Sequence, residues 1–260
     1  MRCRKAWTLG YRAFKFNYIV NVMKRDIAYF KKREKLPVGY GFGLDERVVE
    51  YPWILSRLKD EARIIMDAGS SLNHREILFL DIWEKRKLYI TTLFDECRYK
   101  TRFPLFYIYE DLRHLSFEDN YFDSIICIST LEHVGMDNSM FYTPDQSKKE
   151  NNKFAYLEAV KQLKRVLKPG SSIYWTMPYG QYENHGWFQV FDQSMVEALK
   201  KTFAPAQVYE EYFKYENNQW NFSTAEACRD AQYFDIHEES VREKETPAAS
   251  ESIVCLECIK

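Results

Sequence analysis

Residues 63–73 read RIIMDAGSSLN, a short apolar run that ends in an acid and a turn of small residues. The apolar run at 64–66 predicts a buried strand with Asp67 at its carboxyl end. In open α/β sheets, ligands bind outside the carboxyl ends of the strands. We therefore expect Asp67 to face a ligand crevice, where its carboxylate accepts hydrogen bonds from an ammonium or hydroxyl group.

Apolar runs of strand length recur along the chain and alternate with segments of helical periodicity. We predict strands at 64–66, 87–91, 105–109, 123–129, 172–177, 207–215 and 252–259, and helices at 46–58, 73–79, 154–167 and 195–203. Pro52 requires a helix start or a kink, and residues 168–170 predict a turn that caps the helix before them. Strands separated by helices indicate βαβ units and a parallel sheet.

The first 35 residues carry eleven Lys and Arg but only two acidic residues, although the formal net charge of the chain is −1. Aromatic and aliphatic residues are interleaved with these charges. A basic amphipathic segment can lie on an anionic membrane or another polyanion, or it can pack on the domain with its basic face in water. We predict an N-terminal extension over residues 1–45 and one domain over residues 46–260.

The cysteines and the apolar runs indicate where the protein works. The apolar run at 18–23 is too short to span a bilayer, and no secretory h-region with a cleavage site is recognisable. The six cysteines are scattered, which favours reduced thiols and a cytoplasmic location, peripheral to the membrane if the basic segment binds lipid. Cys255 and Cys258 have CxxC spacing but would face opposite sides of a strand, so we predict no metal site. No nucleic-acid-binding module is recognisable.

Four motifs follow one another along the chain: DAGSS at 67–71, DLRHLSF at 111–117, STLEHV at 129–134 and LKPG at 167–170. In this order and spacing they resemble the class I S-adenosylmethionine-dependent methyltransferases of the small-molecule or glycan type. The resemblance implies a Rossmann-like, doubly wound, seven-stranded and mostly parallel α/β sheet. It also implies helices on both faces and an antiparallel last strand.

The resemblance implies S-adenosyl-L-methionine as the cofactor and assigns residues to it. Asp67 would lie near the ammonium, Gly69 would let the loop approach the ligand, Asp95 would take the ribose hydroxyls and Asp111 the adenine amine. Ser129 would face the methionine part. The full set of implied cofactor residues is Asp67, Gly69, Ser71, Asp95, Asp111, Leu112, Ser129 and Thr130.

Methyl transfer from a sulfonium needs mainly alignment, with a base when the acceptor is a hydroxyl. His133 and His185 are the candidate bases, although each can instead be a framework or lid residue. The tyrosine-rich loops and the GWFQ segment at 186–189 are similar to methyltransferases of surface-polysaccharide synthesis, which predicts a small-molecule or sugar acceptor. Ser71 and Asn73 stand where many members have glycine, so a catalytically inactive cofactor-binding scaffold is an alternative. The basic segment leaves an RNA methyltransferase as another.

Overall fold

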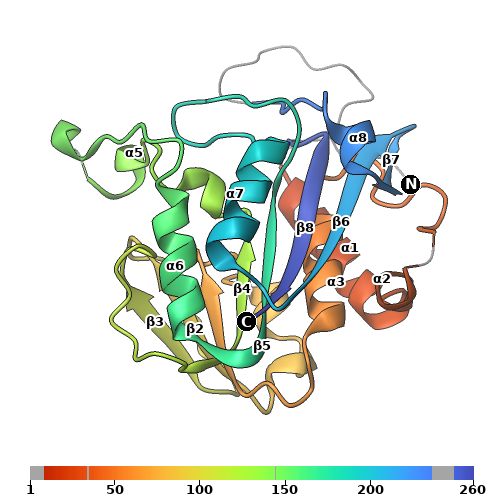
Figure 1. Cartoon of the computed structure of the whole chain (residues 1–260). Helices are drawn as coiled ribbons and strands as arrows, with labels where there is room; N and C mark the ends of the chain where they lie inside the picture. The colour runs from red at the N-terminus through yellow and green to blue at the C-terminus, as the bar shows by residue number, and fades with distance from the viewer. Residues whose placement is uncertain (1–8, 34, 144, 236–248) are drawn as a thin grey trace.

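The computed structural model of the chain describes residues 9–33, 35–143, 145–235 and 249–260. Its centre is an eight-stranded sheet with the order β3-β2-β1-β4-β5-β8-β6-β7 (Figure 1). The strands are β1 (Ile64–Ala68), β2 (Lys87–Thr92), β3 (Leu105–Tyr109), β4 (Phe122–Ile128), β5 (Leu167–Pro178), β6 (Gln207–Glu216), β7 (Gln219–Ser223) and β8 (Ser252–Ile259). Strands β1 to β5 pair in parallel, whereas β8 is antiparallel to both β5 and β6.

The sheet is mostly parallel with an antiparallel last strand, as predicted, and has one strand more than the seven predicted. The additional strand is β7, which pairs with β6 at the edge of the sheet. Two residues connect the pair, Asn217 at φ 52° and Asn218 at φ 60°. Positive φ at both positions defines a type I′ hairpin turn, which asparagine tolerates.

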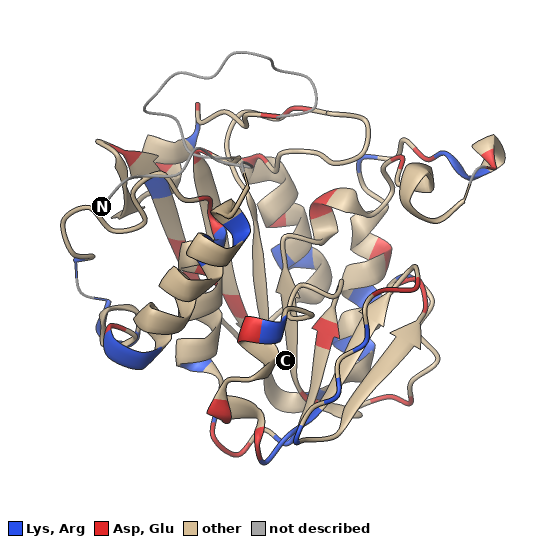
Figure 2. Ribbon diagram, turned by 180° about the vertical axis from the view of Figure 1, so that it is seen from behind, with Lys and Arg blue, Asp and Glu red and all other residues tan. Residues whose placement is uncertain are grey.

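Helices cover both faces of the sheet, and each face has its own apolar core. One face carries α1 (Tyr11–Arg25), α2 (Ala28–Lys32), α3 (Arg47–Arg57) and α4 (Arg75–Leu78), seen from behind in Figure 2. The other face carries α6 (Tyr156–Val166) and α7 (Gln193–Phe203), at the front of Figure 1. Two further short helices are α5 (Ser139–Tyr142) and α8 (Ala225–Cys228).

Helix α1 packs on the domain through one side. Its residues Tyr11, Phe16, Ile19 and Val22 are buried in the same core as α3. The exposed side of the helix includes Arg12, Lys24 and Arg25. Residues 1–8 of the basic segment lie outside the described residues.

The order in which strands are added to the sheet reverses at β1. Strands β2 and β3 extend the sheet on one side of β1, and β4 and β5 extend it on the other. Asp67 lies at this point, in register with Ile90 of β2 and Ile126 of β4. The carboxyl ends of β1 and β4 therefore border the crevice in which ligands of open α/β sheets bind.

Pro52 lies inside α3 without breaking it. Proline has no N–H to donate to the carbonyl of Val48, four residues earlier. The hydroxyl of Tyr40 donates to that carbonyl instead, at 2.6 Å. The carbonyl is thereby satisfied in the core, and α3 remains one helix from Arg47 to Arg57.

Helix α6 passes directly into β5. Leu167, the residue after the helix, already has extended backbone with ψ 139° and belongs to the strand. Residues 168–170 are therefore the first part of β5 and not the predicted helix cap.

Candidate active site

A cavity of about 710 Å³ opens at the carboxyl ends of β1 to β4. Six of the predicted cofactor residues and one predicted histidine line it: Gly69, Ser71, Asp111, Leu112, Ser129, Thr130 and His133. Three predicted residues do not: Asp67 is fully buried, Asp95 is exposed outside the cavity, and His185 lines a neighbouring cavity of about 650 Å³. The structure thus brings most, but not all, of the predicted site together.

The buried side chain of Asp67 supports the loop after β1. Its Oδ2 accepts the backbone N–H of Leu72 at 2.8 Å, while its Oδ1 is buried with no hydrogen-bond partner among the described residues. Burial raises the pKa of Asp67 to about 8. Gly69 has φ 108°, and a Cβ at this position would lie 2.1 Å from Oγ1 of Thr130. The loop therefore needs both its acid and its glycine.

Glu96, and not Asp95, is the acid after β2 that faces the cavity. Its carboxylate accepts hydrogen bonds from Ser70 Oγ at 2.6 Å, Asn73 Nδ2 at 3.0 Å and Thr92 Oγ1 at 3.0 Å. Asp95 instead accepts from Arg98 and Tyr109 at the surface. Because the two acids are adjacent, the sequence alone does not show which of them faces the cavity.

Asp111 is held by an arginine two residues later. Arg113 donates to both carboxylate oxygens of Asp111 and, at 2.6 and 2.8 Å, to both oxygens of Glu150. Burial works against ionisation of Asp111, but the hydrogen bonds from Arg113 outweigh it and lower the pKa of Asp111. Arg113 and Glu150 also line the cavity, and neither was predicted from the sequence.

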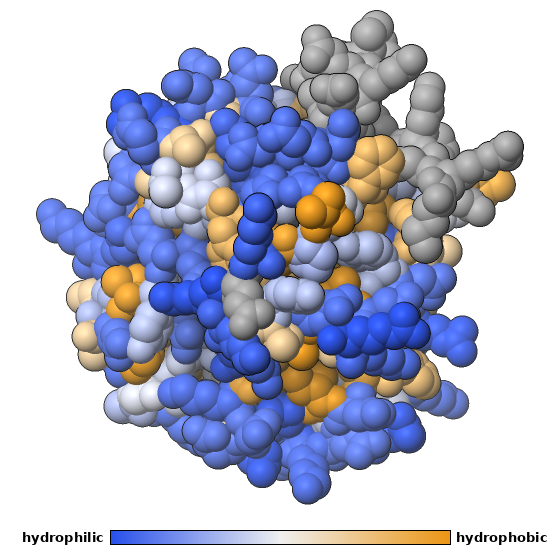
Figure 3. Space-filling view, turned by 90° about the vertical axis from the view of Figure 1, so that its right-hand side faces the viewer, coloured by the Kyte–Doolittle hydropathy of each residue, from blue (hydrophilic) through white to orange (hydrophobic). Residues whose placement is uncertain are grey.

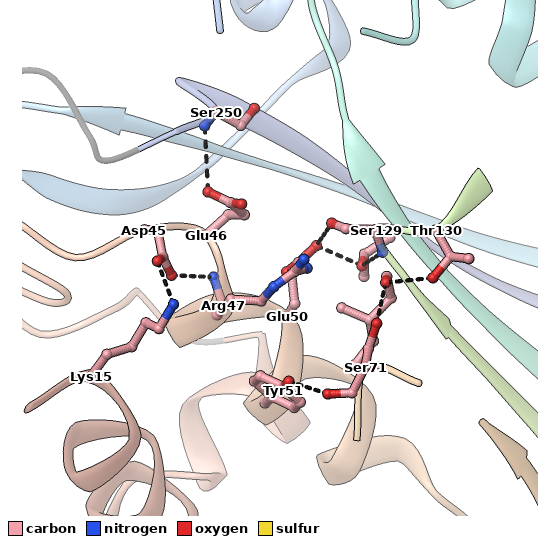
Figure 4. A network of polar contacts seen from close by, with 12 residues as sticks. Lys15, Asp45, Glu46, Arg47, Glu50, Tyr51, Ser71, Ser129, Thr130 and Ser250 are labelled. Carbon is pink, nitrogen blue, oxygen red and sulfur yellow. Dashed lines mark hydrogen bonds and ion pairs between the residues drawn. The ribbon is translucent and has the colours of Figure 1, made fainter. Parts of the chain in front are cut away.

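A second unpredicted cation, Arg47, reaches the cavity from the start of α3. Its Nη1 donates to Glu50 Oε2 at 2.5 Å. The other oxygen of Glu50, Oε1, accepts from the hydroxyls of Ser129 and Thr176, each at 2.6 Å (Figure 4). This fully buried carboxylate therefore connects α3 to the ends of β4 and β5.

His133 lies in the cavity wall in a defined tautomer. Its Nδ1 is 3.0 Å from the carbonyl oxygen of Trp187, which can only accept, so Nδ1 carries the proton. Nε2 therefore keeps a lone pair. Burial, reinforced by Arg47, lowers the pKa of His133 to about 4, so the ring is neutral at pH 7.

Trp187 separates the two candidate histidines. Its ring is 5.0 Å from that of His133 and borders both cavities. His185 stacks on Phe188 at 4.4 Å and has its Nε2 3.2 Å from Glu183. The two histidines therefore serve different cavities.

The described residues hold no group of three or more His, Cys, Asp or Glu placed to bind a metal ion.

The cavity suits a nucleoside joined to an amino acid. Glu96 can accept from ribose hydroxyls, Asp111 can accept from an exocyclic amine, and Gly69 leaves room for close approach of a ligand to the backbone. With β8 antiparallel between β5 and β6, the sheet is the mostly parallel Rossmann-like sheet with an antiparallel last strand that was predicted.

Residues 71–175 match a family model described as "Methyltransferase domain". This segment is a methyltransferase domain, as the motifs predicted, with S-adenosylmethionine as its cofactor. Among solved structures, it is similar to an S-adenosylmethionine-dependent methyltransferase of Thermotoga maritima, with 12% identity over 94% of this chain and 100% of the other and a TM-score of 0.45.

It is also similar to the 1,6-didemethyltoxoflavin-N1-methyltransferase of Burkholderia thailandensis, a structure with bound S-adenosylhomocysteine. Here the identity is 13% over 100% of this chain and 93% of the other, with a TM-score of 0.44. No curated protein matches the chain in sequence.

Proposed function

We propose that the chain methylates a hydroxyl group of a small-molecule or sugar acceptor, in the narrower form a sugar of surface-polysaccharide synthesis. The observation that carries the proposal is the orientation of His133. Its Nδ1–H is held by the carbonyl of Trp187, so a neutral Nε2 is available as an acceptor in the cavity wall. A positioned imidazole of this kind can take the proton of a hydroxyl as its oxygen is alkylated.

The aromatic side chains around the cavity support a ring-shaped acceptor. Phe141 stacks on Phe94 at 6.2 Å and meets Trp187 edge-on at 5.8 Å. Phe141 also keeps 47% of its surface exposed. Flat apolar faces at a cavity mouth are suited to the C–H face of a sugar or to another ring.

S-adenosylmethionine supplies a methyl group on a sulfonium, and its in-line displacement by the acceptor oxygen leaves S-adenosylhomocysteine. In the proposed site Glu96 takes the ribose hydroxyls in place of Asp95, and Asp111 accepts from the adenine amine beside the backbone N–H of Leu112. Asp67 keeps the loop in shape near the ammonium. The residues proposed to lie against the rest of the cofactor are Gly69, Ser71, Ser129 and Thr130.

Transfer of a labelled methyl group to a panel of sugars and small alcohols tests the proposal. His133→Ala should keep cofactor binding and lower turnover about 10²-fold, the low end of the usual contribution of a general base, because its lowered pKa makes His133 a weak base. His185→Ala is the comparison, since His185 lines the other cavity. Unchanged turnover in both variants removes the general base, and methylation of amines alone would refute a hydroxyl acceptor.

We further propose that residues 1–35 touch an anionic membrane or polyanion through charge alone, since α1 places its apolar side in the core. The part of the chain that the structure describes has no helix long and apolar enough to cross a membrane. The face that carries α1 and α2 is mostly hydrophilic outside the grey atoms (Figure 3). Its exposed basic residues include Lys24, Arg25, Lys31 and Lys32.

Replacing these four residues by Glu should abolish co-sedimentation with phosphatidylserine vesicles and leave the cofactor affinity unchanged. Equal co-sedimentation of the variant and the parent would refute contact through these charges. Truncation is a poor test because residues 11–25 are part of the packed domain.

A further inference from the structure

Arg47 is a charged donor that neither the motifs nor the proposed chemistry uses. Its side chain keeps 25% of its surface exposed and lines the cavity. Among the described side chains only Glu50 accepts a hydrogen bond from its guanidinium, through Nη1. Since a guanidinium has five N–H donors, the described side chains use only a small part of its hydrogen-bonding capacity.

The position of this guanidinium identifies the part of the cofactor beside it. One oxygen of Glu50 accepts a hydrogen bond from Arg47 and the other accepts one from Ser129, so a single carboxylate bridges Arg47 and Ser129. Tyr51, on the same helix, donates to the backbone oxygen of Ser71. Arg47 therefore lies near the β1 and β4 ends of the cavity. S-adenosylmethionine carries one anionic group, the α-carboxylate of its methionine part.

The remaining charges at the cavity leave this anion few other partners. The acids Glu96, Glu110, Asp111 and Glu150 line the cavity and would repel a carboxylate. Arg113 is engaged by Asp111 and Glu150, and Lys148 is exposed on the loop after α5.

Helix α1 holds the start of α3, and with it Arg47. Asp45, buried with 1% of its surface exposed, accepts the backbone N–H of Arg47 at 3.2 Å. The same carboxylate accepts from Lys15 Nζ at 2.5 Å (Figure 4) and from the Tyr11 hydroxyl at 3.2 Å. The Tyr11 hydroxyl in turn accepts the backbone N–H of Asp45 at 2.9 Å.

We propose that Arg47 binds the α-carboxylate of S-adenosylmethionine and that the Lys15–Asp45 ion pair of helix α1 positions it. The N-terminal helix is then part of the cofactor site rather than an appendage to it. A guanidinium forms two parallel hydrogen bonds with a carboxylate, which suits recognition of this group by shape as well as by charge. The proposal depends on the cofactor and not on the identity of the methyl acceptor.

Two nucleosides separate this role from a general effect on the pocket. S-adenosylhomocysteine has the carboxylate, whereas 5′-methylthioadenosine has the same adenosine and sulfur but no amino acid. In titration calorimetry, Arg47→Gln should weaken S-adenosylhomocysteine binding about 10- to 100-fold, as expected for a charged hydrogen bond. Binding of 5′-methylthioadenosine should stay within about twofold, and Arg47→Lys should recover part of the loss. Equal losses for both ligands, or no loss for either, would overturn the proposal.

The supporting role of α1 is tested with a matched pair of lysines on that helix. Lys15→Met should weaken S-adenosylhomocysteine binding about 5- to 20-fold and spare 5′-methylthioadenosine, and Lys24→Met, at an exposed position, should change neither. Loss of both ligands by a folded Lys15→Met protein would show that α1 supports the whole cavity and not Arg47. If Lys15→Met does not fold, Tyr11→Phe takes its place, with the same selective loss expected and an unchanged affinity as the opposing result. No methyl acceptor is present, so failure here is distinct from failure of the proposed acceptor.

Discussion

A methyl group added at Gly69 would enter the space of Thr130. The new Cβ would lie 2.1 Å from Oγ1 and 2.2 Å from Cγ2 of Thr130, and the backbone has φ 108°. Gly170 supplies the matched control, because its φ is also positive, at 74°, and a Cβ there meets nothing within 4 Å. Gly170→Ala should therefore lose only the backbone term, about 1 kcal/mol of the free energy of unfolding. Gly69→Ala should lose about 2 kcal/mol more through overpacking.

Urea unfolding and calorimetric titration of S-adenosylhomocysteine measure the two consequences. Gly69→Ala should also weaken binding of S-adenosylhomocysteine, because the loop must shift away from Thr130. Gly170→Ala should leave that affinity unchanged. Adding Thr130→Ala to Gly69→Ala removes the two closest atoms and should restore part of the stability. Equal losses of stability in the two alanine variants, with ligand affinity unchanged in both, would refute the steric reasoning.

Three further predictions address the acids and the proline. Glu96→Gln should weaken binding of S-adenosylhomocysteine about 10-fold, as expected for loss of a hydrogen bond to a charged group, whereas Asp95→Asn should leave binding unchanged. Equal affinities of the two variants in calorimetry would contradict this. Since the pKa of Asp67 is raised to about 8 in the folded protein, the folded state retains a proton that the unfolded state has lost, and stability falls as pH rises from about 4 to 8. Asp67→Asn should remove up to about 1.4 kcal/mol per pH unit of that slope, measured by urea unfolding across the range; parallel curves would count against it. Tyr40→Phe should lose about 1–2 kcal/mol by exposing the carbonyl that Pro52 leaves without a donor, and adding Pro52→Ala should recover most of it; an additive double mutant would show no such coupling.

Strands with continuous apolar runs could be predicted closely from the sequence. The bounds of β3 and β8 agree with the predicted 105–109 and 252–259, and those of β1, β2 and β4 differ by one or two residues. In β1, β4 and β8 the apolar run reflects burial on both faces, whereas the edge strand β3 has the run without being buried. Strand β7 was missed because it is a short edge strand in which only Trp220 is buried, so its sequence lacks that signal.

The candidate site was predictable where it follows directly from strand ends. Gly69, Asp111 and Ser129 each come just after a strand, and parallel strands bring their carboxyl ends to one edge. Arg47 reaches the same cavity from a helix that no local pattern connects to it, so only the packing of α3 reveals it. The choice between Asp95 and Glu96 depends on the path of an irregular loop, for which strand alternation gives no rule.

The hydrogen bonds of Glu50 constrain the order in which the protein can become active. Its two hydroxyl partners lie 79 and 126 residues further along the chain, at Ser129 and Thr176. During synthesis from the N-terminus, Glu50 is made before both of its partners. If its carboxylate is buried before β5 has been synthesised, it lacks at least the hydrogen bond from Thr176. A cofactor pocket anchored by Glu50 therefore matures late in folding, after contacts of long sequence separation have formed. Nascent chains that end before β5 should have no measurable affinity for S-adenosylhomocysteine.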